Sequence, residues 1–368
     1  MKNEPQVDSA NGGSDTVAGA LSVVRRNGNT FGLLALAVSV ALIFSLINPA
    51  VYASGLNVKS IALSIPEVGL MALAVSVAMT VAGIDLSIVA VANLSAIFIA
   101  WYSRVGIEQG QSSAMVTAVA LVGGISIGAI CGLINGFVIA KLKVAPILTT
   151  LATMQIFMGI AIALTRGEAA YGVTEPLANF GYDSFLGIPL VFWLFTVVVL
   201  VVWAVMIKTK FGLRSTMMGA SRMTAEYSGI TYPWVIMRAY VLAGMISAAA
   251  GVILVARTAS ASADYGSSYV LLAITIAVLG GANPFGGRVA IIGAALAAIV
   301  LQLIASGLNM MGVSTYVYQI VQGLILVGVF VVAFERKRIH DAVSLKRNRA
   351  KSNEQPFIEA KELEETHA

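Results

Sequence analysis

Residues Val289–Phe334 read VAIIGAALAAIVLQLIASGLNMMGVSTYVYQIVQGLILVGVFVVAF and contain no charged side chain. An α-helix rises about 1.5 Å per residue, so about 20 apolar residues cross the roughly 30 Å hydrocarbon layer of a membrane. Uncharged runs also occupy Asn27–Asn57, Gln109–Ala140 and Val144–Thr165. A soluble domain rarely contains even one such run. The sequence therefore predicts a protein that crosses a membrane many times.

Composition narrows the fold class further. The chain of 368 residues is 58% hydrophobic and 11% charged, with a mean hydropathy of +0.88, whereas soluble domains carry about 25% charged residues. Backbone in lipid must satisfy its own hydrogen bonds, which leaves a helix bundle or a closed barrel. A barrel needs alternating strands of about ten residues, and the runs here are continuous. We therefore expect an all-α transmembrane helix bundle.

Charged residues and loop signals divide the apolar region into about ten predicted helices. The eighth is short enough to be a broken or re-entrant helix. The predicted spans are 31–48, 60–82, 84–102, 114–140, 145–165, 187–207, 235–256, 268–282, 289–308 and 314–334.

The remaining residues form two predicted tails. We expect a disordered cytoplasmic arm at 1–30, a transmembrane domain at 31–334 and a cytoplasmic tail at 335–368. If the N-terminus lies in the cytoplasm, most basic loop residues also lie on the cytoplasmic side. The basic residues of the outer loops are then only Lys59, Arg104, Arg166 and Arg257. Basic residues favour the cytoplasmic side, so the sequence predicts that both termini are cytoplasmic. The excess of basic over acidic residues is thus explained by the orientation of the helices in the membrane and not by nucleic-acid binding.

Few residue types suited to cofactors or metals are present. Cys131 is the single cysteine, and the histidines His340 and His367 both lie in the tail. We therefore expect no disulfide framework, no metal site and no cofactor. Glycines recur every four residues at Gly124, Gly128, Gly132 and Gly136, and a row of small residues on one helix face indicates close packing against another helix.

Two acids lie within apolar segments, and such residues are costly in a membrane and often functional. Asp85 lies at a helix junction, where its carboxylate is suited either to cap the next helix or to take part directly in transport. Glu67 follows Pro66 near a predicted membrane face, where a kink or a membrane-interface position is the simpler interpretation.

The chain shows no catalytic motif. The cluster Gly280–Arg288 lacks the Gly-Lys-Ser/Thr ending of a phosphate-binding loop and is better interpreted as a tight turn between helices. We therefore expect a protein that is not an enzyme and has no ATPase of its own.

The longest polar segment between predicted helices is Lys208–Pro233. In it, Ser221 is suited to cap a short helix and Gly229 to end it, with Pro233 shortly after. A short cytoplasmic helix bounded in this way is typical of a docking element, and the alternative is a plain basic loop that fixes topology.

At these residues the chain resembles the permease subunits of bacterial ABC importers for monosaccharides, the ribose-type family. Gly83-Ile84-Asp85-Leu86-Ser87 resembles the family's GIDLS motif. The stretch Thr209–Gly212, with Gly219 and Ala225–Ile230, resembles its cytoplasmic coupling loop. The stretches Asp264–Tyr269, Val278–Gly287 and Gly307–Ser314 resemble its late glycine-rich region.

The resemblance implies a multi-pass transport subunit of the bacterial inner membrane. It implies separate ATPase subunits, a periplasmic binding protein, surrounding lipid, and a second permease that is identical or a paralogue. The implied ATPase-coupling residues are Gly219, Ser221, Ala225, Glu226 and Gly229. Polar residues suited to line the solute pathway, each with interhelical hydrogen bonding as the alternative, are Asp85, Ser87, Asn93, Ser95, Gln155, Gln302 and Asn309.

Three alternatives remain beside an importer permease for a sugar or related small polar solute. A branched-chain amino acid permease of the same superfamily is the nearest, although a zwitterion favours more buried charge than this chain shows. An ion-coupled secondary transporter requires midplane coupling acids and inverted repeats, and no clear repeat is visible. A membrane-bound enzyme has no catalytic residues to support it.

Overall fold

The computed structural model describes residues 28–314, 316–325, 327–328 and 331. Among them, eight helices are long and apolar enough to cross a membrane. These helices are α2 (Gly28–Ile47), α4 (Gly55–Thr80), α5 (Ile88–Glu108), α6 (Ser113–Lys141), α7 (Pro146–Thr165), α9 (Leu190–Lys208), α12 (Tyr232–Thr258) and α14 (Ile291–Met310). The predicted all-α transmembrane bundle is confirmed.

The predicted eighth segment is α13 (Tyr269–Leu279), an apolar helix too short to count among the eight. It ends at a turn in which Gly281, Gly286 and Gly287 have positive φ, so Gly280–Arg288 is a turn, as its sequence indicates. Residues 316–325, 327–328 and 331 are helical and belong to a second compact unit. The predicted tail at 335–368 and nearly all of the arm at 1–30 lie outside the described residues.

Local signals set several helix ends. The Ser54 side chain accepts a hydrogen bond from the Asn57 amide and begins α4, five residues earlier than predicted. The helix continues through Pro66 as far as Thr80. Glu67 therefore lies near the middle of α4, and its assignment to a kink or a membrane interface stays a prediction.

In the first compact unit, whose described residues are 28–314, α4 and α12 are the most buried spans, whereas α2 is largely exposed. The glycine row of α6 explains its packing against α12. A Cβ added at Gly128 or Gly132 would overlap the backbone of Gly244 or Tyr240, and one at Gly136 would lie 2.7 Å from the Met237 Cα. The fourth glycine, Gly124, faces Ile99 of α5 instead.

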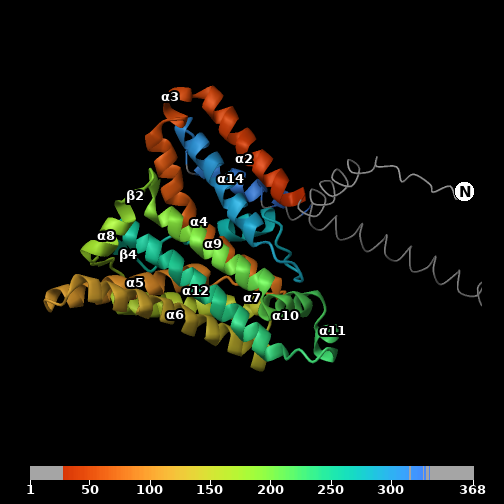
Figure 1. Cartoon of the computed structure of the whole chain (residues 1–368). Helices are drawn as coiled ribbons and strands as arrows, with labels where there is room; N and C mark the ends of the chain where they lie inside the picture. The colour runs from red at the N-terminus through yellow and green to blue at the C-terminus, as the bar shows by residue number, and fades with distance from the viewer. Residues whose placement is uncertain (1–27, 315, 326, 329–330, 332–368) are drawn as a thin grey trace, which may run out of the picture. The chain divides into compact units, whose positions relative to one another are not determined.

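Two different structures lie at the opposite ends of α12, which is about 40 Å long at 1.5 Å per residue. Before it come the short helices α10 (Lys210–Ala220) and α11 (Arg222–Tyr227), grouped at one end of the bundle in Figure 1. After it comes β4 (Ser260–Ala261), which pairs antiparallel with β1 (Ala170–Tyr171). Shorter elements complete this description: α3 (Pro49–Tyr52), α8 (Glu175–Tyr182), and the pair β2 (Ser184–Phe185) and β3 (Ile188–Pro189).

Candidate functional site: a polar turn, a docking loop and a buried ion pair

Asp85 and Ser87 lie in the turn between α4 and α5, and both are buried. The Asp85 carboxylate oxygen Oδ1 accepts hydrogen bonds from the Ser87 amide at 2.9 Å and from the Ser87 hydroxyl at 2.7 Å. Ser87 is the N-cap residue of α5. The carboxylate thus supports the start of the helix through its capping residue, and does not itself cap a free amide of the first turn.

The hydrogen bonds continue from this turn into two other helices. The Asn135 side-chain amide of α6 donates to the Ser87 hydroxyl at 2.8 Å. The Thr153 hydroxyl of α7 then donates to the Asn135 carbonyl oxygen at 2.6 Å. Four buried polar side chains therefore join the turn, α6 and α7. Sequence reasoning did not identify Asn135 or Thr153, because their distance along the chain gives no sign of this contact.

The Asp85 carboxyl group lies outside both flanking spans but is completely buried. Burial raises the pKa of Asp85, and the hydrogen bonds from Ser87 partly oppose that rise. No lysine or arginine forms an ion pair with it in the described part of the chain. A buried carboxylate without a cation depends on its hydrogen bonds, so Ser87 is the main stabilising partner of Asp85.

The other predicted pathway residues are dispersed. Asn93 is buried in α5, and its side-chain amide donates to the carbonyl oxygens of Ala263 at 3.0 Å and Tyr265 at 2.8 Å. Ser95 is buried, and its hydroxyl has no hydrogen-bond partner. Gln155 and Asn309 are exposed on α7 and α14, and Gln302 is half-buried. Only Asp85 and Ser87 contact one another directly.

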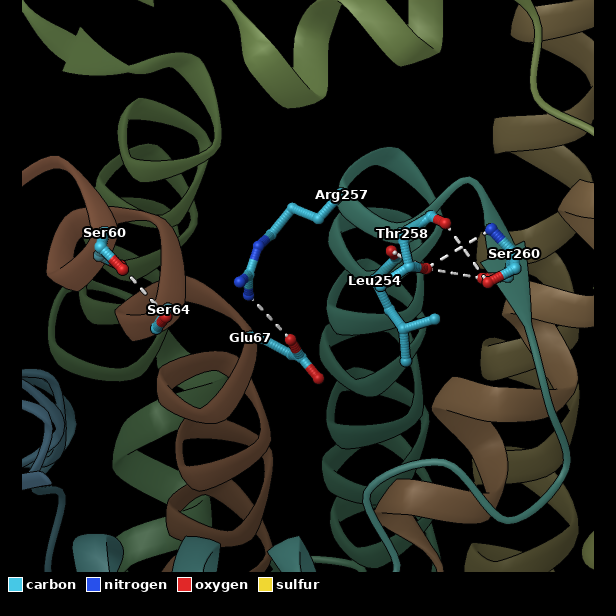
Figure 2. Close-up of polar contacts among 7 residues, drawn as sticks. All are labelled: Ser60, Ser64, Glu67, Leu254, Arg257, Thr258 and Ser260. Carbon is cyan, nitrogen blue, oxygen red and sulfur yellow. Dashed lines mark hydrogen bonds and ion pairs between the residues drawn. The ribbon is translucent and has the colours of Figure 1, made fainter. Parts of the chain in front are cut away.

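Sequence reasoning missed a buried ion pair between α4 and α12. Arg257 Nη1 lies 3.0 Å from Glu67 Oε2, and Figure 2 shows the two side chains extending toward each other from separate helices. The two residues are separated by 190 positions in the chain. The available signals were an acid inside an apolar segment and an arginine predicted to lie on the outer side.

The segment between α9 and α12 contains two helices where the sequence predicts one. The Ser221 hydroxyl accepts a hydrogen bond from the Thr224 amide at 3.3 Å and begins α11. The chain leaves α11 through Gly229, whose φ is +76°. Both local signals are therefore confirmed as structural features of this segment, residues 209–231, hereafter called the docking loop after the role that the sequence predicts for it.

The docking loop is fastened tightly to the bundle. Gly219 packs so closely that an added Cβ would overlap the Thr80 carbonyl oxygen at the end of α4, and that same oxygen accepts a hydrogen bond from the Gly287 amide at 3.1 Å. Ala225 is buried in an apolar cluster with Ile139 of α6 and Tyr240 of α12. Gly219 and Ala225 are therefore interior anchors in this structure, not surface groups.

The outer face of the docking loop presents three large apolar side chains among exposed polar and charged ones. Leu213, Met223 and Tyr227 have exposed fractions of 63%, 70% and 87%. Met223 and Tyr227 are four residues apart on α11 and so share one helix face, with Ser221, Glu226 and Gly229 also exposed. An exposed group of large apolar side chains is typical of a protein-binding surface.

Two further observations concern metal binding and cavities. Among the described residues, no group of histidine, cysteine and acidic side chains is arranged to hold a metal ion. A cavity of about 550 Å³ lies beside α5 and the segment after α7, lined in part by Trp101, Arg104, Arg166 and Glu168. It contains none of the predicted pathway residues.

Known proteins are similar to this chain over most of its length. The family model described as "Branched-chain amino acid transport system / permease component" matches residues 57–330. The autoinducer 2 import system permease protein LsrD of Salmonella paratyphi B is 33% identical over 88% of this chain and 98% of its own length. The ribose import permease protein RbsC of Bacillus subtilis is 33% identical over 86% of this chain and 94% of its own.

One solved structure is also similar, an ABC transporter assigned to the metal-chelate type in an inward-facing conformation. It is 16% identical, with a TM-score of 0.49 over 83% of this chain and 98% of its own.

The apolar helix bundle and the similarity to transport permeases make this chain a membrane transport subunit. More specifically, the chain belongs to the family of branched-chain amino acid transport system permease components. It is a multi-pass protein of the bacterial inner membrane and a non-catalytic permease subunit of an ABC importer, in which ATP hydrolysis belongs to a partner ATPase. The family assignment excludes the ion-coupled secondary transporter and the membrane-bound enzyme.

Proposed function

We propose that this permease imports a sugar or a related small polar solute from the periplasm to the cytoplasm, and that the docking loop is its contact with the ATPase. The curated relatives named for ribose and for autoinducer 2 support the solute class. A periplasmic binding protein delivers the solute, and a second permease copy or a paralogue completes the pathway.

The observation that carries the coupling role is the two-sided structure of the docking loop. Its inner side is anchored through Gly219 and Ala225 to the ends of α4, α6 and α12. Its outer side presents Leu213, Met223 and Tyr227. A partner that binds the outer face and moves therefore moves the central helices with it, because closely packed interiors deform little.

Replacement of Gly229 tests this role. No heavy atom lies within 4 Å of a Cβ added there, so a substitution acts through the backbone φ of +76° alone. Gly229→Val strains that conformation, whereas Gly229→Asn tolerates it better. We expect Gly229→Val to reach the membrane, capture less ATPase in co-purification and lose uptake, while Gly229→Asn keeps both. Normal ATPase capture and uptake by Gly229→Val would remove the docking loop from this role.

Orientation is tested separately by cysteine labelling. Cys131 is buried and is the single cysteine of the chain, so Cys131→Ala provides a background for introduced cysteines. In intact cells, a membrane-impermeant maleimide should label Tyr171→Cys on β1 and should label Met223→Cys only after lysis. The reverse pattern would place the docking loop and the termini on the periplasmic side.

The proposed second permease copy is supported by the exposed polar residues Gln155 and Asn309 on apolar helices, because polar side chains favour protein contacts over lipid. Gln155→Cys in the same background should form a disulfide-linked dimer under oxidation if two copies meet along α7. The exposed Met115→Cys on α6 serves as a comparison. Equal crosslinking at both positions would indicate random collision and not a defined interface.

A further inference from the structure

In the ion pair between Glu67 and Arg257, only one of the two carboxylate oxygens of Glu67 has a hydrogen-bond donor. The Glu67 side chain is 3% exposed and that of Arg257 is 24% exposed. Glu67 Oε2 is bound by Arg257, whereas Oε1 is buried without a hydrogen-bond partner. A buried charged oxygen without a donor is costly. A pair that only stabilised packing would gain from a second donor at Oε1, and the described residues supply none.

A second unpartnered acceptor belongs to Asn93 of α5, which holds the loop that follows α12. Tyr265 lies close enough that its pKa, raised mainly by burial, is raised further by Glu67 and lowered by Arg257. Asn93 holds the loop through the carbonyl oxygens of Ala263 and Tyr265, but the Asn93 oxygen Oδ1 is itself buried without a partner. The Tyr265 segment is thus held by a side chain with an unmatched acceptor, and it is influenced electrostatically by Glu67, which has another.

Hydroxyl groups lead along α4 toward the pair. Ser60, Ser64 and Glu67 are spaced by four and three residues, which places them on one face of the helix. Ser60 is exposed, Ser64 is half-buried and Glu67 is buried, so the face becomes progressively more enclosed. Figure 2 shows these residues on the same helix, with Arg257 reaching across from α12.

We propose that Glu67, Arg257 and Tyr265 form a recognition site for a neutral, hydroxyl-rich solute passing through the permease. This inference rests on the proposed sugar import. A solute hydroxyl would donate to Glu67 Oε1, other hydroxyls would accept from the remaining guanidinium N–H groups, and the Tyr265 ring offers a flat apolar face. Charge-assisted hydrogen bonds of this kind are stronger than neutral ones.

The charge balance favours a neutral solute. Glu67 and Arg257 neutralise one another at 3.0 Å, so an anion or a cation would leave one of the two charges unmatched. A zwitterionic amino acid would match both charges but would have to separate the pair in order to bind. A neutral polyol can use the unpartnered oxygen while the ion pair stays intact.

The test compares Glu67→Gln with the charge exchange Glu67→Arg/Arg257→Glu. The complete importer is placed in proteoliposomes with its ATPase and binding protein, and uptake of labelled neutral monosaccharides is measured, D-ribose first. The ATPase activity stimulated by the loaded binding protein is measured in parallel, because it reports assembly of the complex. Glu108→Gln, an exposed acid of α5, is the control.

We expect Glu67→Gln to lower sugar uptake about tenfold while stimulated ATPase activity stays within about twofold of wild type. The charge exchange should likewise keep protein amount and ATPase activity near those of wild type without restoring uptake. If it restores uptake, the pair is structural and the proposal is wrong.

Two further outcomes are decisive. Tyr265→Leu removes the aromatic ring face and should lower uptake severalfold, so unchanged uptake in both Tyr265→Leu and Glu67→Gln would overturn the site and leave sugar import standing. If the wild type imports valine and none of the sugars, both the site and the proposed solute class are wrong. Loss of ATPase capture, as tested with Gly229, concerns only the docking loop.

Discussion

The two ends of α12 are held by contacts of different kinds. Where the helix begins, Tyr240 and its neighbours pack with Ala225 in an apolar cluster, and Gly219 meets the end of α4 with no space for a Cβ. Where it ends, Arg257 pairs with Glu67, and the loop that follows is held by Asn93 and by the pairing of β4 with β1. The first end is held by close packing of apolar side chains and backbone, and the second end is held by an ion pair and hydrogen bonds.

This difference matches two different mechanical tasks. Closely packed apolar groups and backbone deform little, so movement applied to them passes on to the helices they hold. Polar contacts can be exchanged for contacts with water or a solute at small net cost. The docking-loop end is therefore suited to transmit force from a partner, and the end at Glu67 and Arg257 is suited to exchange hydrogen bonds with a passing solute while the ion pair stays intact.

Gly219→Val should have the largest effect, because it disrupts the closely packed contact near the start of α12. The added side chain would overlap the Thr80 carbonyl oxygen and lie against the Gly287 amide, and overpacking against backbone costs about 1–3 kcal/mol or more. We expect loss of uptake, with most of the protein missing from the membrane fraction.

Gly32→Val on α2 is the matched control, since no heavy atom lies within 4 Å of its added Cβ. It should give normal protein amounts and normal uptake. Normal uptake by Gly219→Val would show that this contact opens readily, and the contrast between the two ends of α12 would fail.

Replacement of Asp85 should have the next largest effect and separates hydrogen bonding from charge. Asp85→Asn keeps an oxygen that can accept from the Ser87 amide and hydroxyl. Asp85→Ala leaves both buried donors unmatched, at about 1–3 kcal/mol each. We expect Asp85→Asn to support uptake and Asp85→Ala to lower the melting temperature in detergent and abolish uptake.

The opposite results are equally informative. Loss of uptake in Asp85→Asn at a normal melting temperature would assign the charge itself a transport role. Tolerance of Asp85→Ala would exclude both roles, and would show that Asn135 and Thr153 hold the turn without the carboxylate.

Local features were predictable from the sequence, and contacts between distant segments were not. The cap at Ser221 and the positive φ at Gly229 depend on neighbouring residues, and both are found as predicted. Gly219 and Ala225 were predicted to couple to the ATPase but are buried, because the family motif does not reveal which face of a short helix turns inward. The Glu67–Arg257 pair depends on how α4 and α12 are rotated against each other, and residue spacing cannot specify that rotation.

Arg222→Ala should have the smallest effect, although Arg222 makes two contacts at the docking-loop end. Its side chain lies 3.0 Å from Glu226 and 3.8 Å from the centre of the Tyr232 ring. Both side chains of the ion pair are about half exposed, and exposed pairs contribute about 0.2–1 kcal/mol. We expect a small decrease in melting temperature and uptake within about twofold of wild type.

Tyr227→Asp, which places a charge on the exposed apolar face, should reduce ATPase capture much more than Arg222→Ala does. If Arg222→Ala instead loses ATPase capture at an unchanged melting temperature, the partner recognises charge on α11, and the apolar face formed by Met223 and Tyr227 is not the main docking surface.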